Sequence, residues 1–238
     1  MKKFLQIFTI LILALTCSCS KDKDKPSAEL NYTKAVKKLK NRDFSSAAED
    51  FEKISDEYPL SKWGIKAQPM AAYCFYKEEK LTDVIRVSEE FIKNNPSNPD
   101  VAYMQYLKSI AYYDQINDIN RAQDNARSAS SAFRELIARF SNSEYAKDAR
   151  EKLVLVDEHI AGAKMAVGRY QLQSENYIGA IKNFQDVINN YTRTNQTPEA
   201  YFRLFETHQK LGLTSSAEDY QQTLNQTYPD NKWKGNSE

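Results

Sequence analysis

Two of the three cysteines of the chain, Cys17 and Cys19, lie directly behind an apolar N-terminal run. A thiol in this position can be acylated with lipid, whereas an isolated Cys-Ser-Cys has no loop to close as a disulfide framework. Residues 1–3 carry two lysines, and residues 4–15 (FLQIFTILILAL) form a short apolar segment, which is the pattern of a secretory signal. The segment is too short to span a bilayer as a mature helix. We therefore expect residues 1–18 to be a lipoprotein signal peptide that is removed.

The cysteine that becomes the new N-terminus is the candidate lipid attachment point. The run TCSCS at residues 16–20 resembles a bacterial lipoprotein cleavage site, where the cysteine after a small residue is acylated. Cys19 follows the small Ser18 and is preferred; Cys17 follows the bulkier Thr16 and is the alternative. Neither is followed by aspartate, which by the lipoprotein sorting rule argues against retention in the inner membrane. Residues 19–27 then form the lipidated cysteine and a charged, flexible tether.

The rest of the chain offers little material for catalysis or metal binding. Its two histidines, His159 and His208, lie far apart in the sequence, which contains no HExxH, P-loop or GxSxG motif. A surface or packing role is expected for both, and Cys74, within an apolar helical run, is expected to be a small buried hydrophobe. The formal net charge of +1 gives no reason to expect nucleic acid as a partner. We expect no enzymatic activity, no metal site and no cofactor beyond the covalent lipid.

Tyrosine is the one residue type whose abundance suggests a binding site, since the chain has 15 of them. Its ring offers large apolar area and a hydrogen-bonding tip, with little side-chain entropy to lose. Five tyrosines fall at or near positions that would line the concave surface of a helical solenoid, where a client peptide could bind. These residues are Tyr73, Tyr76, Tyr103, Tyr106 and Tyr113. The alternative is that most of these rings fill the space between helices.

The helices that must position these tyrosines follow a repeated pattern. Glycine and proline are scarce, and small and aromatic residues precede each helix break at fixed offsets, as Ala47 and Phe51 precede Pro59. This is the arrangement of the tetratricopeptide repeat (TPR), a pair of antiparallel helices of roughly 34 residues. A small residue lets the second helix of a pair approach the first closely, and the aromatic residue fills the space towards the next repeat. The small residues expected at the crossings are Ala35, Ala47, Ala72, Ser109, Ala129, Gly168, Ala180 and Ala217.

Counting the breaks predicts an all-α solenoid of five helix pairs, or ten helices. Residues 28–141 hold repeats 1–3, residues 142–230 hold repeats 4 and 5, and residues 231–238 form a polar tail. The third repeat is long because of a loop around residues 114–121. The fourth opens with residues 142–173, which lack a strong helix breaker. We expect this segment to be one unusually long helix or two helices that meet near Gly162.

Two stretches resemble the BamD (ComL-like) family, the TPR lipoproteins of the outer-membrane β-barrel assembly machinery. The first runs from AAYCFYK (71–77) through FIKNNPSNPD (91–100) to YMQY (103–106). The second runs from Phe133 through NSEY (142–145) and DAREKL (148–153) to Leu155. The double proline, the tyrosine spacing and the long following helix go beyond what TPR repeats share in general.

The resemblance implies a scaffold held by lipid on the periplasmic face of the outer membrane. It implies that repeats 1–3 recognise unfolded outer-membrane proteins and that repeats 4 and 5 dock on the periplasmic domains of the barrel insertase, with other assembly lipoproteins as possible partners. Ser141 and Thr192 stand where proline is expected, and Pro198 where a charged residue is expected, so no single docking contact is carried over. The alternative hypothesis is a TPR lipoprotein of a cell-envelope glycan or peptidoglycan system that acts as a binding or coordination module.

Overall fold

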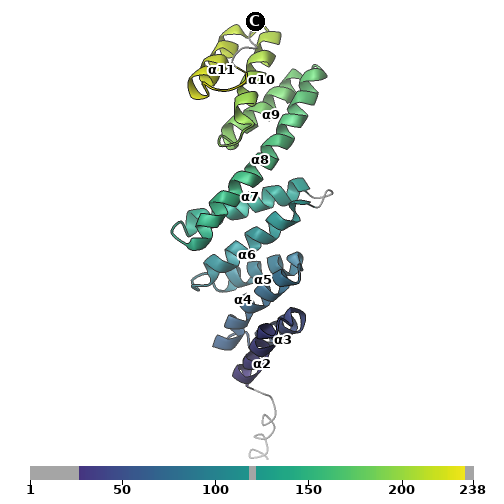
Figure 1. Cartoon of the computed structure of the whole chain (residues 1–238), viewed down its shortest axis with the longest axis vertical. Helices are drawn as coiled ribbons and strands as arrows, with labels where there is room; N and C mark the ends of the chain where they lie inside the picture. The colour runs from purple at the N-terminus through teal and green to yellow at the C-terminus, as the bar shows by residue number, and fades with distance from the viewer. Residues whose placement is uncertain (1–26, 118–121, 234–238) are drawn as a thin grey trace, which may run out of the picture.

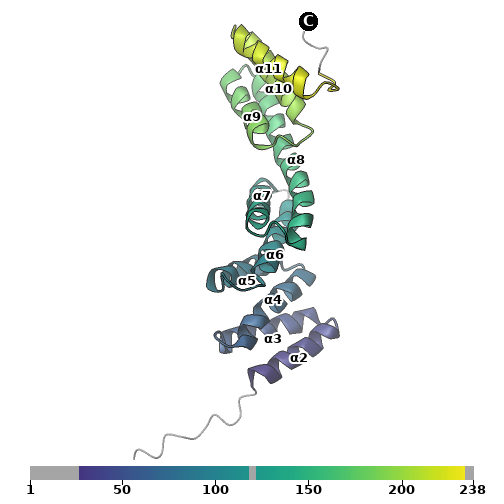
Figure 2. The ribbon, with the colours of Figure 1, turned by 90° about the vertical axis from the view of Figure 1, so that its left-hand side faces the viewer.

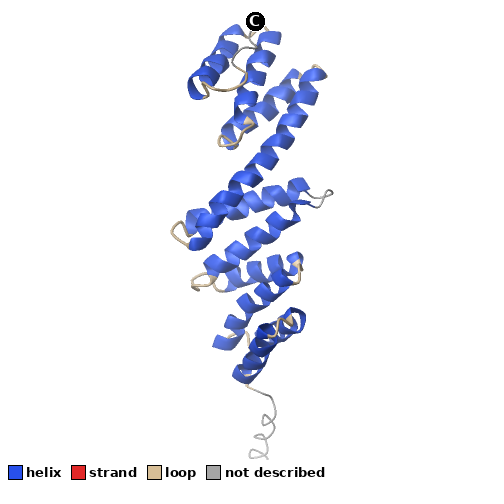
Figure 3. Ribbon diagram, viewed as in Figure 1, coloured by secondary structure: helices blue, strands red, loops and turns tan. Residues whose placement is uncertain are grey.

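The computed structural model describes residues 27–117 and 122–233, and in these residues it contains helices and turns but no β-strand (Figure 3). The α-helices are α2 (Ala28–Lys40), α3 (Phe44–Glu57), α4 (Lys62–Lys77), α5 (Leu81–Asn94), α6 (Val101–Asp114), α7 (Ala122–Arg139), α8 (Glu144–Gln173), α9 (Tyr177–Asn190), α10 (Thr197–Lys210) and α11 (Thr214–Thr227). Consecutive helices pair and stack into an elongated rod (Figure 1). The ten helices of the described residues confirm the predicted solenoid of five helix pairs.

Several predicted features lie outside the described residues. These are the signal peptide, Cys17, Cys19, the tether as far as residue 26, part of the loop after α6 and the end of the polar tail. The described part of that loop is a short 3₁₀ helix, η1 (Gln115–Asn117). Within the described residues, no helix combines the length and the apolarity that a membrane crossing requires.

The predicted crossings between paired helices are tightly packed. The predicted alanines at the crossings and Ser109 are at most 1% exposed, as are the aromatic residues Phe51, Phe133 and Phe184. At Gly168 of α8, a Cβ atom would lie 2.5 Å from Cε1 of Phe184 on α9. Interiors packed this densely leave no room for an added methyl group. The small residues therefore determine how closely each pair of helices can approach.

The turns within four of the pairs share one backbone feature. Each has a single residue in the left-handed region, and three of these residues are not glycine. They are Arg42 (φ 61°), Glu79 (φ 56°), Glu175 (φ 58°) and Gly212 (φ 72°). Such a conformation is unfavourable for residues other than glycine. The packing of the helices on either side must therefore stabilise these tight turns.

Helix α8 is a single helix of 30 residues, so the alternative of a break near Gly162 is wrong. Its first half packs on α7 through Val156 and Ile160, and its second half packs on α9 and α10 through Ala161 and Met165. Nothing lies within 4 Å of a Cβ atom added at Gly162. In Figure 1, α8 runs obliquely between the two ends of the rod and joins them.

The first residues of the predicted polar tail pack against α10. The Trp233 ring stacks on Phe202 with centroids 5.1 Å apart, and the Arg203 guanidinium lies 5.2 Å from the Trp233 ring centroid. Trp63, at the start of α4, makes the matching contact with Tyr32 at 5.1 Å. The sequences YPLSKW (58–63) and YPDNKW (228–233) are alike, so residues 228–233 resemble the first turn of a further repeat.

The two glycines of α8 provide a matched test of the crossing. Gly168→Ala should lower the free energy of unfolding by about 1–3 kcal/mol, because the new methyl group overlaps the Phe184 ring. Gly162→Ala should raise it by up to about 1 kcal/mol, because alanine favours helix and has free space there. Urea unfolding followed by circular dichroism measures both changes. Equal stability of the two variants would contradict the packing argument.

Candidate functional site

The five predicted tyrosines lie on adjacent helices, with Tyr73 and Tyr76 on α4 and the other three on α6. All five side chains are partly buried. Tyr73 lies 6.3 Å from Phe44 and Tyr113 lies 6.2 Å from Phe133, as ring centroids in edge-on contact. The structure therefore brings these residues into one region, where each ring has both a packed and an exposed part.

Two of the five tyrosines bind α6 to α8. The rings of Tyr103 and Tyr106 lie 5.6 and 5.3 Å from the ring of Tyr145, at the start of α8. The Tyr106 hydroxyl donates a 2.9 Å hydrogen bond to Asp148 Oδ2, and Lys152 Nζ lies 3.1 Å from Asp148 Oδ1. These contacts favour the packing interpretation for Tyr103 and Tyr106. Tyr145 was absent from the predicted site, although the NSEY run had placed it at the entry to the long helix.

Burial raises the pKa of several groups in this region. Burial raises the pKa of the Tyr106 phenol well above its ordinary value, and the hydrogen bond to Asp148 and the charge of Asp148 raise it further. Burial, followed by the charge of Asp114, also raises the pKa of Tyr76. The pKa of Asp114 itself is raised by burial. Neutral phenols are therefore strongly favoured at physiological pH, and they can donate hydrogen bonds.

A cavity of about 720 Å³ opens beside these tyrosines. Its lining combines aromatic, aliphatic and charged side chains from α4, α5, α6, η1 and α8. The lining residues are Tyr76, Lys77, Glu79, Leu81, Tyr113, Asp114, Ile116, Leu155, Val156 and His159. We call this the tyrosine cavity. Of the five predicted tyrosines, only Tyr76 and Tyr113 line it.

The wall that α8 contributes to the tyrosine cavity was not predicted. Leu155 is 59% exposed, and His159, one helical turn later, is also exposed. Their i, i+4 spacing puts both on the same face of the long helix. His208 has a packing role, because it is buried and its Nδ1 lies 2.8 Å from the Leu204 carbonyl oxygen. Cys74 is fully buried, as predicted.

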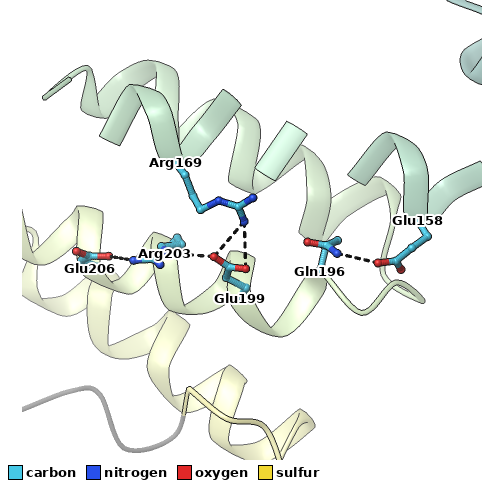
Figure 4. Close-up of polar contacts among 6 residues, drawn as sticks. All are labelled: Glu158, Arg169, Gln196, Glu199, Arg203 and Glu206. Carbon is cyan, nitrogen blue, oxygen red and sulfur yellow. Dashed lines mark hydrogen bonds and ion pairs between the residues drawn. The ribbon is translucent and has the colours of Figure 1, made fainter. Parts of the chain in front are cut away.

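A second polar cluster joins the far half of α8 to α10 (Figure 4). Arg169 Nη1 lies 3.2 Å from both carboxylate oxygens of Glu199. Arg203 contacts Glu199 through Nε at 3.4 Å and Glu206 through Nη1 at 2.8 Å. The Glu199 side chain is only 15% exposed, so two arginines balance its charge in a partly dry site. This network fixes the angle between α8 and α10.

Four exposed apolar side chains lie in the same part of the chain as this second cluster. Tyr170 of α8 is 70% exposed, and Ile178, at the start of α9, is 82% exposed. Leu211 and Leu213, in the turn between α10 and α11, are 41% and 49% exposed. Tyr170 lies in the last turn of α8 and Ile178 in the first turn of α9, whereas the leucines lie in the loop that joins the next two helices. We call these four residues the distal apolar patch.

Among the described residues, no group of three or more His, Cys, Asp or Glu side chains is arranged to hold a metal ion. The chemistry that the two regions can perform is binding through apolar area, phenol hydroxyls and charged groups. The fold and these regions define a TPR solenoid with two candidate binding surfaces joined by one long helix.

Comparison with known proteins shows the family. Residues 23–224 match the YfiO family, described as outer membrane lipoprotein, and the chain belongs to this family. A relative from Rickettsia prowazekii, called outer membrane protein assembly factor BamD, is 35% identical over 202 residues, which cover 85% of this chain and 80% of that protein. The protein of the same name from Caulobacter vibrioides is 34% identical, covering 86% of this chain and 67% of the relative. The resemblance to BamD found in the sequence is thereby confirmed.

The hydrogen bond between Tyr106 and Asp148 can be tested through the pH dependence of stability. Tyr106→Phe should lower the free energy of unfolding by about 1 kcal/mol at neutral pH. The raised pKa means that the folded state holds the phenol proton more tightly than the unfolded state does. The stability gained from this tighter binding is complete below about pH 10, the pKa of the phenol in the unfolded chain. It is lost as the pH rises from there through the higher pKa of the folded state.

Stability should therefore decline above about pH 10 more steeply in the parent chain than in Tyr106→Phe. Denaturant unfolding of both proteins across this range measures the difference, in which the titration of other groups cancels. Parallel curves would show that Tyr106 does not hold its proton more tightly in the folded state.

Proposed function

We propose that this chain is an outer-membrane protein assembly factor, a non-catalytic scaffold that holds unfolded client proteins and a barrel insertase side by side. The family match and the assembly role for which the two relatives are named support this proposal. The observation that carries it in this chain is α8, which lines the tyrosine cavity at one end and bears part of the distal apolar patch at the other. The scaffold is held to the outer membrane on its periplasmic face by lipid on Cys19, or on Cys17.

The tyrosine cavity suits a segment of an unfolded outer-membrane protein. Strands of such proteins alternate apolar and polar side chains, with aromatic residues near their ends. Leu155, Tyr76 and Tyr113 offer apolar area to one face of a segment, whereas Lys77 and Asp114 offer charge and hydrogen bonds to the other. The mixed lining favours many related sequences over a single one, which is what a factor with many clients requires.

The distal apolar patch suits a folded protein domain. Tyr170 and Ile178 expose large apolar surfaces that cost free energy in water, and aromatic anchors of this kind dominate the affinity of protein interfaces. The network of Arg169, Glu199 and Arg203 holds the helices beneath the patch in one arrangement. A fixed surface reduces the entropy lost on docking. We assign the periplasmic domains of the insertase to this patch.

Leu155→Asp tests the client site. The substitution puts a charge on the wall of the tyrosine cavity, at a side chain exposed enough for the fold to tolerate the change. We expect affinity for a labelled, unfolded outer-membrane protein segment to fall roughly tenfold, as the loss of one apolar contact predicts. Fluorescence anisotropy measures the affinity. Leu60→Asp, at a side chain that is 95% exposed and outside the cavity, is the control and should bind as the parent does.

Tyr170→Ala combined with Ile178→Asp tests the docking site. Affinity purification from mildly solubilised outer membranes should recover a large β-barrel protein with periplasmic domains from the parent chain and lose it from the double variant. Leu155→Asp should still recover that protein, and the double variant should still bind the client segment. If the parent recovers proteins of envelope glycan or peptidoglycan systems and no such β-barrel protein, the alternative hypothesis replaces this one.

A further inference from the structure

The first and last helices of the rod differ in charge. Helices α2 and α11 lie at opposite ends of the rod (Figure 2). Helix α2 carries four lysines against one glutamate, whereas α11 carries Glu218 and Asp219 and no lysine or arginine. The chain as a whole has a formal net charge of +1, so this difference reflects how charge is distributed along the rod. An anionic surface would attract the lysines of α2, whereas α3 behind them carries five acidic residues against one lysine.

The charge of α2 is concentrated on the face that no other helix covers. Tyr32, Val36 and Leu39 pack inward against α3 and α4, around the fully buried Ala35. Lys38 forms a 2.6 Å ion pair with Asp50 of α3. The residues of the opposite face are exposed. They include Leu30, Thr33, Lys34, Lys37 and Lys40, and we call these five the α2 outer face. Glu29 beside them is exposed too, and Lys34 also lines a cavity with Asp50 and Glu57 of α3.

The position of α2 in the chain brings this face close to a membrane. If Cys19 carries lipid, as proposed above, residues 20–26 separate the acyl chains from the first turn of α2, and even fully extended they span at most about 25 Å. Leu30, which is 48% exposed, lies in that first turn. Lysines this close to an anionic leaflet are attracted to its surface, and an exposed leucine beside them can enter the headgroup region.

We propose that the α2 outer face lies on the anionic lipid headgroups of the leaflet that holds the anchor. The lipid on Cys19 confines the chain to the membrane, and Lys34, Lys37 and Lys40 then orient the rod with its α11 end away from the surface. This contact depends on the proposed lipid anchor but not on clients or on an insertase. A membrane of lipid alone is therefore enough to test it.

The test uses the lipidated full chain with Thr33→Cys labelled by a nitroxide. Cys74 is fully buried and Cys19 is acylated, so the new thiol is the accessible one. In vesicles of phosphatidylcholine and phosphatidylglycerol, the label should become less accessible to a water-soluble relaxation reagent than in vesicles of phosphatidylcholine alone. High salt should reverse the protection. The same label at Ser215→Cys, on α11, should stay accessible in both kinds of vesicle.

Charge-reversal variants distinguish contact through the α2 outer face from non-specific attraction that depends only on the net charge of the protein. Lys34→Glu with Lys37→Glu should lower the equilibrium constant for surface contact by at least about 25-fold, because each lysine contributes about fivefold near an anionic surface. Lys147→Glu with Lys182→Glu, which changes the net charge equally at exposed sites on α8 and α9, should keep the protection. Equal accessibility of the Thr33 label in both vesicle types would overturn the proposal. Protection that persists without anionic lipid and grows with protein density would do so too, because it would indicate a second copy.

The mass of the N-terminal peptide separates failure of this proposal from failure of the anchor. If that peptide is acylated but the label at position 33 is not protected, the α2 contact is overturned and the lipid anchor is not. A peptide without acyl chains overturns the anchor instead. The α2 outer face is then tested by co-sedimentation of the full chain with anionic vesicles, where the absence of salt-sensitive binding overturns it.

Discussion

The close crossing of the two helices in each repeat is the constraint on which the rest of the structure depends. At Gly168 the helix backbone meets the Phe184 ring so closely that a methyl group has no space, and alanines perform the same role at the other crossings. This distance determines where the next helix can pack, because the large aromatic residues fill what the small ones leave open. The positions of Tyr76, Tyr113 and Leu155 around the tyrosine cavity follow from these distances.

Helix α8 turns a stack of similar repeats into a scaffold with two different surfaces. Its first half belongs to the core around Phe133 and its second half to the core around Phe184, so the two halves of the chain share one continuous helix. At about 1.5 Å per residue, Leu155 and Tyr170 are roughly 22 Å apart along that helix. If the two surfaces bind as proposed, the client segment and the docked domain would therefore contact different parts of α8. The network around Glu199 keeps the second surface in line with the first.

Repeat count, crossings and the long helix could be predicted from the sequence because each depends on local spacing: small and aromatic residues recur at fixed offsets, and residues 142–173 lack a breaker. The site was predicted less completely. The tyrosine spacing places Tyr103 and Tyr106 on the helix that lines the cavity, but it cannot show that Tyr145 and Asp148, some forty residues later, pack on them. Leu155 and His159 were missed for the same reason. The packing of Trp233 on Phe202 was also missed, although Trp233 and Trp63 each end a YPxxKW sequence, which relates the two positions.

The order of the surfaces along the rod has a consequence for how such a scaffold works. Helix α2 comes first along the rod, the tyrosine cavity follows at α4, α6 and the first half of α8, and the distal apolar patch lies farther from α2. A rod whose α2 end lies on the membrane would hold its docking surface away from the bilayer. It would then meet the periplasmic part of an insertase before the barrel itself. A client in the tyrosine cavity would lie between that partner and the membrane, along the path that an inserting strand must take.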